Sequence, residues 1–357
     1  MKRNRKRWMV IGMLALVCLL LPGCGRQQVQ RQEETEAQEE EIQIGLSFDS
    51  FVIERWMRDR DVFVSKAQNL GAEVNVQNAN GDVEEQISQI EYFINKDMDV
   101  IVIIAIDGEA LTDVVKEAKN AGIKVISYDR LIMNAGTDLY ISFDNYKVGT
   151  LMGEALKAAV PDGGDIFAIY GSQSDSNVEM VKAGLSDSLA GSGLEIVYDT
   201  YCDNWLAELA FDAVNEGLKE HEDIVGVMCG NDDLASQAIK ALAEHRMAGK
   251  VAVVAQDADL SACQRIVEGT QEMTVYKPVD DLASQAATLA VALAKGEDIT
   301  GAGAKLRVRD TISDGTQEIP YYSMDPVAVT AENMDAVIID SGFHMAEDVY
   351  LNVRQES

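Results

Sequence analysis

Polar and aromatic side chains that could bind a polyhydroxylated molecule follow the short apolar segments of this 357-residue chain. A carboxylate only accepts hydrogen bonds, Arg and Lys only donate them, and Asn does both, so such a mixture suits hydroxyl groups. Trp rings add flat platforms for the C–H faces of a sugar ring. The residues that follow the apolar segments are 49–56, 78–81, Asp107, Asp129, Arg130, 144–145, 175–177, 202–205, 231–232, 256–257 and Lys277.

Each of these residues also has a plainer interpretation. A single Asp or Asn after a strand is often a helix cap or a turn residue. Trp56 could belong to the hydrophobic core as readily as to a ligand platform. The set as a whole, with Arg and Trp mixed in, favours a binding site over a series of caps.

Catalytic, metal and cofactor motifs are missing from the sequence. It has three His and five Cys, with no HExxH pair, no CxxC pair, no GxSxG elbow and no P-loop. Residues 301–303 begin a GxGxxG pattern, but Leu306 occupies its last Gly position. The acidic clusters lack the ligand spacing of a calcium loop. We therefore expect a binding protein without cofactor or metal rather than an enzyme; a glycosidase that uses two carboxylates is the alternative.

These side chains need a scaffold, and from residue 42 onward short apolar runs alternate with longer amphipathic stretches. Nearly all-apolar strands that alternate with helices are typical of parallel sheets covered on both faces, which is a doubly wound α/β fold. The expected strands are 42–48, 73–77, 100–105, 124–128, 139–143, 165–170, 195–201, 224–229, 251–255 and 273–276. The expected helices are 54–70, 83–95, 111–120, 177–190, 205–220, 233–247, 259–268 and 279–294.

A weak internal repeat divides this body into two similar lobes. In each half an apolar strand is followed by a helix and then by a strand that ends at an Asp, namely Asp129 in the first half and Asp257 in the second. The plainer explanation is that all α/β units look alike. In open α/β sheets ligands bind at the carboxyl ends of the strands, and the polar set described above lies at those ends.

The first residues have the composition of an export signal. Basic residues at 2–7 precede the apolar segment 8–21, which is too short for an ordinary membrane-spanning helix. Leu21-Pro22-Gly23-Cys24 resembles the lipobox of bacterial lipoproteins, which implies a signal peptide over 1–23 and a lipid on Cys24. The Gln- and Glu-rich composition that follows predicts a disordered tether over 24–41. A plain signal peptide or a short anchor is the alternative.

The charge of the chain excludes several partners. Its formal net charge is −30, and removal of residues 1–23 takes away five basic and no acidic residues, leaving 25 − 60 = −35. Such a chain would be repelled by nucleic acid and by an anionic membrane surface. We expect the excess charge on outer faces and the tether.

Residues 42–345 resemble the periplasmic-type sugar-binding proteins of bacterial ABC transporters, of the ribose/galactose class, and most closely those members that bind D-xylose. The segments that carry the resemblance are 54–56, 59–61, 88–91, 114–119, 128–130, 140–145, 256–260, 273–278 and 340–344. The resemblance implies two Rossmann-like lobes joined by a three-segment hinge. It places lobe I at 42–146 plus 278–314 and lobe II at 147–277 plus 315–357.

The resemblance also implies a ligand site between the lobes. Its members here are Arg55, Trp56, Asp129, Arg130, Asp175, Asn177, Trp205, Asn231, Asp257 and Lys277. Trp56 and Trp205 match the two stacking rings of the family, and the others match its hydrogen-bonding groups. Two departures affect the rim of the cleft: Tyr201 stands where the family usually has a further Trp, and residues 105–108 replace a more polar turn.

The function implied is extracytoplasmic binding of a monosaccharide, with D-xylose favoured over ribose, glucose or galactose, by a monomer that is lipid-anchored to the cell membrane. Closure of the lobes on the sugar would present it to the membrane subunits of an ABC permease. A sugar-sensing partner of a receptor kinase or chemoreceptor is the alternative. A sugar-responsive transcription regulator would need a basic helix-turn-helix at the N-terminus, where this chain has its export signal instead.

Overall fold

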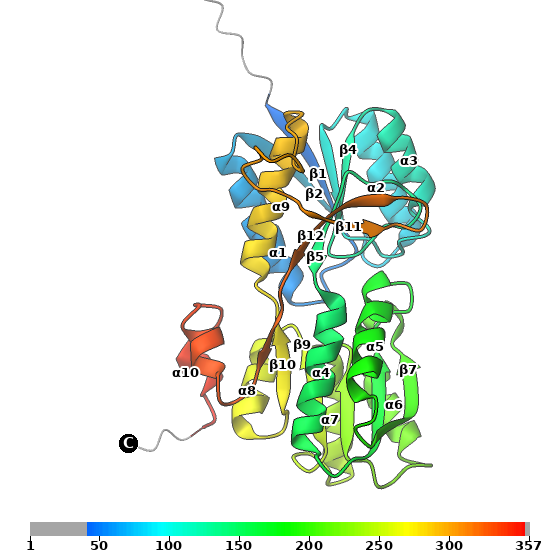
Figure 1. The fold of residues 1–357 in the computed structure, drawn as a ribbon, viewed down its shortest axis with the longest axis vertical. Coiled ribbons are helices and arrows are strands. Elements are labelled where there is room, and N and C mark those ends of the chain that lie inside the picture. The colour runs from blue at the N-terminus through cyan, green and yellow to red at the C-terminus, as the bar shows by residue number, and fades with distance from the viewer. Residues whose placement is uncertain (1–40, 354–357) are drawn as a thin grey trace, which may run out of the picture. The chain divides into compact units, whose positions relative to one another are not determined.

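A computed structural model of the protein describes residues 41–353 (Figure 1). The first of its two sheets begins at residue 42 and has seven strands in the order β11-β12-β5-β4-β3-β1-β2. The expected signal segment and Cys24 lie outside the described residues. The strands are β1 (Ile42–Phe48), β2 (Ala72–Asn78), β3 (Val100–Ile103), β4 (Lys124–Tyr128), β5 (Leu139–Phe143), β11 (Asp310–Ser313) and β12 (Glu318–Met324). All neighbours are parallel except β11 and β12, which form an antiparallel hairpin.

Helices cover both faces of this sheet, which explains why its inner strand β3 is apolar throughout. The helices are α1 (Arg55–Asn69), α2 (Val83–Asn95), α3 (Thr112–Asn120) and α9 (Val279–Ala294). In β3, Val100 and Val102 belong to one hydrophobic cluster, and Ile101 and Ile103 belong to another. Because successive side chains of a strand point to opposite faces, the four residues must all be apolar when both faces are covered.

The second sheet has six strands in the order β13-β10-β9-β8-β6-β7, and only β13 runs antiparallel within the described residues. The strands are β6 (Gly164–Tyr170), β7 (Leu194–Tyr201), β8 (Gly226–Cys229), β9 (Ala252–Gln256), β10 (Met273–Tyr276) and β13 (Val327–Val329). The helices are α4 (Asn145–Ala159), α5 (Ser176–Leu189), α6 (Glu208–Gly217), α7 (Asp232–Glu244) and α8 (Leu260–Glu268). A single-turn helix, Asp203–Trp205, follows β7, and a π-helical turn, Asp335–Ile339, and α10 (Ala346–Val349) follow β13. The expected doubly wound α/β class with two lobes is therefore confirmed.

Two helices of the second lobe approach each other unusually closely. A Cβ atom on Gly149 of α4 would collide with the backbone oxygen of Val181, and one on Gly184 of α5 would collide with that of Tyr146. Because only Gly allows this approach, the backbones of α4 and α5 pack directly against each other. α4 starts directly after β5 of the first lobe, and α5 carries candidate site residues at its first turn, so this pair connects the interlobe crossing to the site.

The chain crosses between the lobes at three places. β5 leads into α4 at Asp144, β10 leads into α9 at residues 277–278, and β12 leads into β13 at residues 325–326. The backbone N–H of Asp144 donates to the oxygen of Met324 at 2.9 Å, which ties the first crossing to the third.

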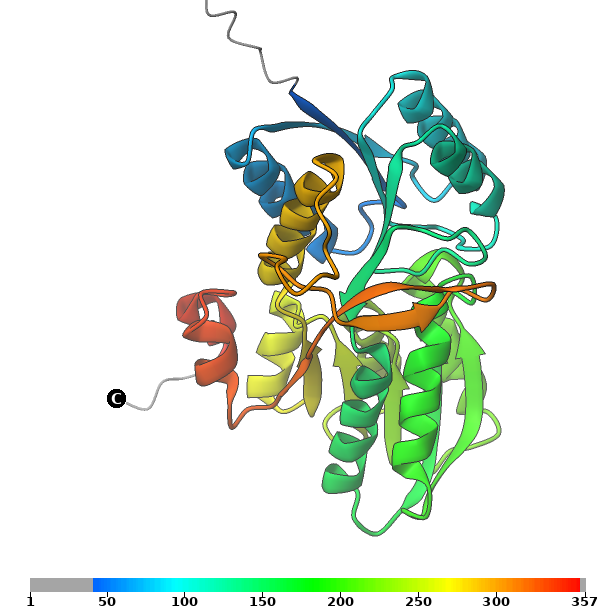
Figure 2. The same ribbon diagram turned by 45° about the horizontal axis from the view of Figure 1, so that its top comes forward.

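The third crossing differs from the expectation that it lies near residue 314. β12 pairs with β5 in the first sheet (Figures 1 and 2), so residues 315–324 belong to lobe I and the crossing follows Met324. The hairpin was not predicted because it interrupts the alternation of strands and helices. α4 and β13 were not predicted either. No helix between residues 41 and 353 combines the length and the apolar character needed to cross a membrane.

Candidate functional site

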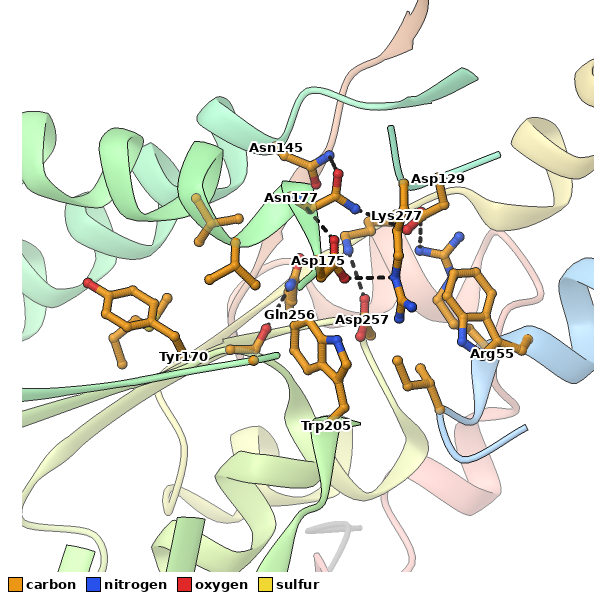
Figure 3. A pocket seen from close by; sticks show the side chains of 18 residues that line it. Arg55, Asp129, Asn145, Tyr170, Asp175, Asn177, Trp205, Gln256, Asp257 and Lys277 are labelled. Carbon is orange, nitrogen blue, oxygen red and sulfur yellow. Dashed lines mark hydrogen bonds and ion pairs between the residues drawn. The ribbon is translucent and has the colours of Figure 1, made fainter. Parts of the chain in front are cut away.

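A cavity lies where the carboxyl ends of the strands of both lobes face each other (Figure 3). The space between its walls, counted together with its open mouth, is about 470 Å³. The lining includes the expected residues Arg55, Trp56, Asp129, Arg130, Asp175, Asn177, Trp205, Asp257 and Lys277. The structure therefore brings together the side chains that were expected from their positions at strand ends.

Arg55 is the first residue of α1 and is held by carboxylates on two sides. Its Nε and Nη2 lie 3.3 and 3.0 Å from the carboxylate of Asp59, one turn further along the helix, and Nη1 lies 3.0 Å from Asp129. The Tyr128 hydroxyl donates to Asp59 at 2.5 Å. The guanidinium also lies 4.4 Å from the ring of Trp56. This arrangement fixes the Arg55 fork before any ligand binds.

Arg130 connects the two lobes. Its Nη1 donates to Asp49 at 2.8 Å and to the backbone oxygen of Ala105 at 2.9 Å, both in lobe I. Its Nε lies 2.7 Å from Oδ2 of Asp175, which caps the N-terminus of α5 in lobe II. The pair is close, but the N–H is not aligned with the carboxylate, so Nε retains capacity for a hydrogen bond.

Asn177 makes a second connection between the lobes. Its Nδ2 donates to Asp129 at 3.2 Å, and its Oδ1 accepts from Asn145 at 2.9 Å and from the Tyr140 hydroxyl at 3.1 Å. The amide is therefore held from three sides. In the same lobe Lys277 pairs with Asp257 at 3.0 Å.

The backbone of the site is strained at corresponding positions of the two lobes. Asp129 follows β4 with φ of 64°, and Asp257 follows β9 with φ of 100°. Trp205 also has a positive φ, of 57°. Non-Gly residues rarely adopt this region, and such outliers cluster at ligand sites. The strain is compensated by the ion pairs that these carboxylates make.

Burial and ion pairing shift the acids of the site in different directions. Burial would raise the pKa of Asp129, but the charges of Arg55, Lys277 and Arg130 together lower it. Burial raises the pKa of Asp49, Asp59 and Asp175 despite their Arg partners. Asp49 lies within the strand-end set but not in the expected site list, and Asp59 lies in neither, because nothing in the sequence shows that they accept bonds from Arg130 and Arg55. They give the buried network two more acids than bases.

Five buried polar atoms of the cavity lack a hydrogen-bond partner. They are the donors Trp56 Nε1, Arg130 Nε and Trp205 Nε1 and the acceptors Gln256 Oε1 and Asp257 Oδ1. Arg130 Nε and Asp257 Oδ1 each contact an opposite charge, on Asp175 and Lys277, without an aligned hydrogen bond. Among the described residues, every buried side-chain N or O atom of this kind belongs to a residue of the cavity lining. An unpaired buried polar group is costly, so the cavity requires a partner that both donates and accepts.

Asn231 is the expected site residue that does not line the cavity. It caps α7, where its Oδ1 accepts from the backbone N–H of Leu234 at 2.9 Å. Capping is the plainer role of an Asn that follows a strand. The lining also contains residues outside the expected site list: Ile53, Asn145, Tyr170, Gly171, Val178, Val181, Met228, Gly230 and Gln256. Ile53, Asn145 and Gln256 lie within the strand-end set, whereas the valines carry no such signal.

The two expected departures lie outside the lining. The Tyr201 hydroxyl accepts from Lys182 at 2.9 Å. The turn at 105–108 contacts the second lobe through its backbone, because the oxygen of Ile106 accepts from the Ser174 hydroxyl at 3.0 Å.

Two α/β lobes, three crossings and a polar cavity between them define a substrate-binding protein of the periplasmic type. A family model described as periplasmic binding protein domain matches residues 44–298, and the chain belongs to this family.

Comparison with known proteins places the chain among sugar-binding members of the family. It is 45% identical over 319 residues to the D-xylose-binding periplasmic protein of Haemophilus influenzae, and the aligned region covers 88% of this chain and 94% of the relative. It is 42% identical over 318 residues to the D-xylose-binding periplasmic protein of Escherichia coli, with the same coverage. A solved ABC transporter solute-binding protein of Clostridium phytofermentans with bound β-D-glucose superimposes with a TM-score of 0.77 at 29% identity, over 86% of this chain and 99% of that one. These relatives are sugar-binding transport proteins, so the expected family is confirmed.

Proposed function

We propose that this protein binds D-xylose between its lobes and delivers it to the membrane subunits of an ABC permease. The observation that carries the proposal is the group of unpaired donors and acceptors in a single cavity. A sugar hydroxyl both donates and accepts, so one small polyol can satisfy all of these atoms together. The names of the two relatives at 45% and 42% identity support D-xylose among the aldoses.

The charged residues of the site suit a neutral ligand. Arg55, Arg130 and Lys277 are each already paired with a carboxylate of the protein. An anionic ligand would have to displace those carboxylates, whereas hydroxyls can add to ion pairs that stay in place. Bonds to charged groups are stronger than neutral ones, so a few hydroxyls supply substantial affinity.

Closure of the lobes is the step that couples binding to delivery. The site takes Arg55, Asp129 and Arg130 from lobe I, and Asp175 and Asp257 from lobe II. A ligand that touches both sets stabilises the closed arrangement through its differential affinity. The three crossing segments would serve as the hinge, and the closed form would be the one that the permease recognises.

The role is binding rather than catalysis, as in the relatives. The chain would act outside the cytoplasm as a monomer, held at the membrane by a lipid on Cys24 and a tether over 24–41. The support for the anchor is the sequence Leu21-Pro22-Gly23-Cys24. In cells that grow on radiolabelled palmitate, the wild-type protein should carry label, and Cys24→Ala should not. Label that persists in the variant would remove Cys24 as the lipid site.

A thermal-shift screen of residues 42–357 against a panel of aldoses tests the function. A ligand at about 100 times its Kd adds about 2.7 kcal/mol to the stability of the folded state, so D-xylose should raise Tm by several degrees. A rise with another aldose and none with D-xylose would reassign the ligand. No rise with any aldose would contradict sugar binding.

Calorimetry of a charge-removing variant tests the site. Lys277→Met should weaken D-xylose binding about tenfold or more, since a charge-assisted hydrogen bond is worth roughly 1.5–3 kcal/mol. Lys295→Met, at an exposed helix end, is the matched control and should keep the wild-type affinity. Equal affinities of the two variants would exclude Lys277 from the site.

A further inference from the structure

The side-chain amide of Gln256 has one half that is fixed and one half that is free. Gln256 is the last residue of β9 and is 5% exposed. Its Nε2 donates to the backbone oxygen of Gly230 at 2.6 Å. Because a carbonyl oxygen can only accept, the NH₂ group must face Gly230 and Oε1 must face away from it. This Oε1 has no hydrogen-bond partner.

The free oxygen belongs to a residue of the cavity lining. Gln256 lines the cavity together with Tyr170, Val178, Val181 and Met228, and Figure 3 shows it beside Trp205. The aliphatic neighbours have no hydrogen to donate. A buried acceptor of this kind is costly unless a donor arrives from outside the protein.

Resting on the proposed function, we infer that Gln256 Oε1 accepts a hydrogen bond from one particular hydroxyl of the bound sugar and thereby determines specificity. A site built to accept from a hydroxyl rejects the analogue without it, because its own polar group then stays unpaired. The charged residues of the cavity can exchange partners among several hydroxyls. Gln256 cannot, since its amide is fixed by its hydrogen bond to Gly230. It therefore requires a hydroxyl at one ring position and in one orientation.

The test is a hydroxyl scan by calorimetry on the full soluble body, residues 42–357. D-Xylose and the analogues that lack each ring hydroxyl in turn are titrated into the wild type and into Gln256→Met. In the wild type, loss of a hydroxyl that the protein binds should weaken affinity about tenfold or more. In Gln256→Met, that penalty should fall to about twofold or less for one hydroxyl and persist for the others.

The matched control is Gln271→Met. Gln271 is another buried Gln of the second lobe, but its Nε2 donates to Asp232 at 2.8 Å, its Oε1 accepts from Arg265 at 2.9 Å, and it does not line the cavity. This variant should lose stability and keep the wild-type hydroxyl scan. If Gln256→Met does not fold, Gln256→Asn makes the same comparison, because it draws the amide back by one methylene.

Two failures are distinguishable. If the wild type binds no aldose, the proposed function fails. If the wild type binds D-xylose but every penalty persists unchanged in both Gln256 variants, the inference is overturned, and Gln256 then bonds to trapped water instead of to sugar.

Discussion

One added methyl group can test whether Trp205 is a ligand platform or a core residue. Trp205 is 8% exposed and its indole lies directly against the backbone of Gly171. A Cβ on Gly171 would lie closer than 3.0 Å to three carbons of the ring, whereas ordinary contacts begin at 3.4 Å. Gly171 is not among the glycines with a positive φ, so Ala can adopt its backbone conformation, and the atoms nearest to the new methyl group are carbons of the Trp205 ring.

The expected effect falls on binding rather than on folding. The backbone of Gly171 closes one side of the indole, and the cavity is the side into which the ring can move. Forcing an extra methyl group into a packed site costs roughly 1–3 kcal/mol, which corresponds to a loss of about 5- to 150-fold in affinity. In the free protein the displaced ring can move toward the cavity that it lines, which avoids part of this cost. Tm without sugar should therefore change by no more than a few degrees.

Calorimetry with D-xylose and a melting curve without sugar separate the two possibilities. The matched control is Gly303→Ala, which has no atom within 4 Å of the new Cβ and lies in a surface segment; it should bind as the wild type does. If Gly171→Ala binds D-xylose within twofold of the wild type and melts much earlier, the ring is a core residue and the reasoning is refuted.

Three further substitutions test other parts of the molecule. Burial raises the pKa of Asp232, so its stabilising contribution is complete when it is protonated and is lost as pH rises through that raised pKa. Urea midpoints of the wild type should therefore fall as pH rises from about 4 to about 7, and they should fall less in Asp232→Asn; equal slopes would contradict this. Arg58 donates to the backbone oxygen of Phe343 at 3.1 Å, so Arg58→Met should speed hydrogen exchange at 340–344, and unchanged protection there would show that the contact is unimportant. Asp59→Asn should weaken D-xylose binding about tenfold by releasing Arg55, whereas a loss of stability with unchanged Kd would leave Asp59 a purely structural role.

Much of the site follows from where strands end. Apolar runs that stop at Asp129 and Asp257 locate the carboxyl ends of two parallel sheets, and these ends meet in the structure as expected. The same reasoning finds Arg130 and Lys277, because they directly follow such ends. Local sequence is sufficient for this part because strand direction and order determine where the ends lie.

The rest depends on partners that are distant in sequence. Asp49 and Asp59 become part of the site only because Arg130 and Arg55 reach them. Asn231 has the same local pattern as the ligand-facing residues, yet a backbone N–H of α7 takes its oxygen. The β11–β12 hairpin attaches to an edge of the first sheet, and no helix separates β11 from β12. The alternation of strands and helices therefore could not predict where the third crossing lies.

The division of ion pairs between the lobes explains how one equilibrium can control both affinity and closure. The Arg55–Asp59 pair forms within lobe I and the Lys277–Asp257 pair within lobe II. The free-energy cost of removing those charges from water therefore arises when each lobe folds, before the ligand binds. The pair between Arg130 and Asp175 forms only when the lobes meet. A sugar therefore encounters oriented groups on each lobe, and its own hydroxyls add to a contact that closure must make in any case. The chain as a whole is strongly acidic, but these paired charges let a neutral ligand determine whether the lobes stay together.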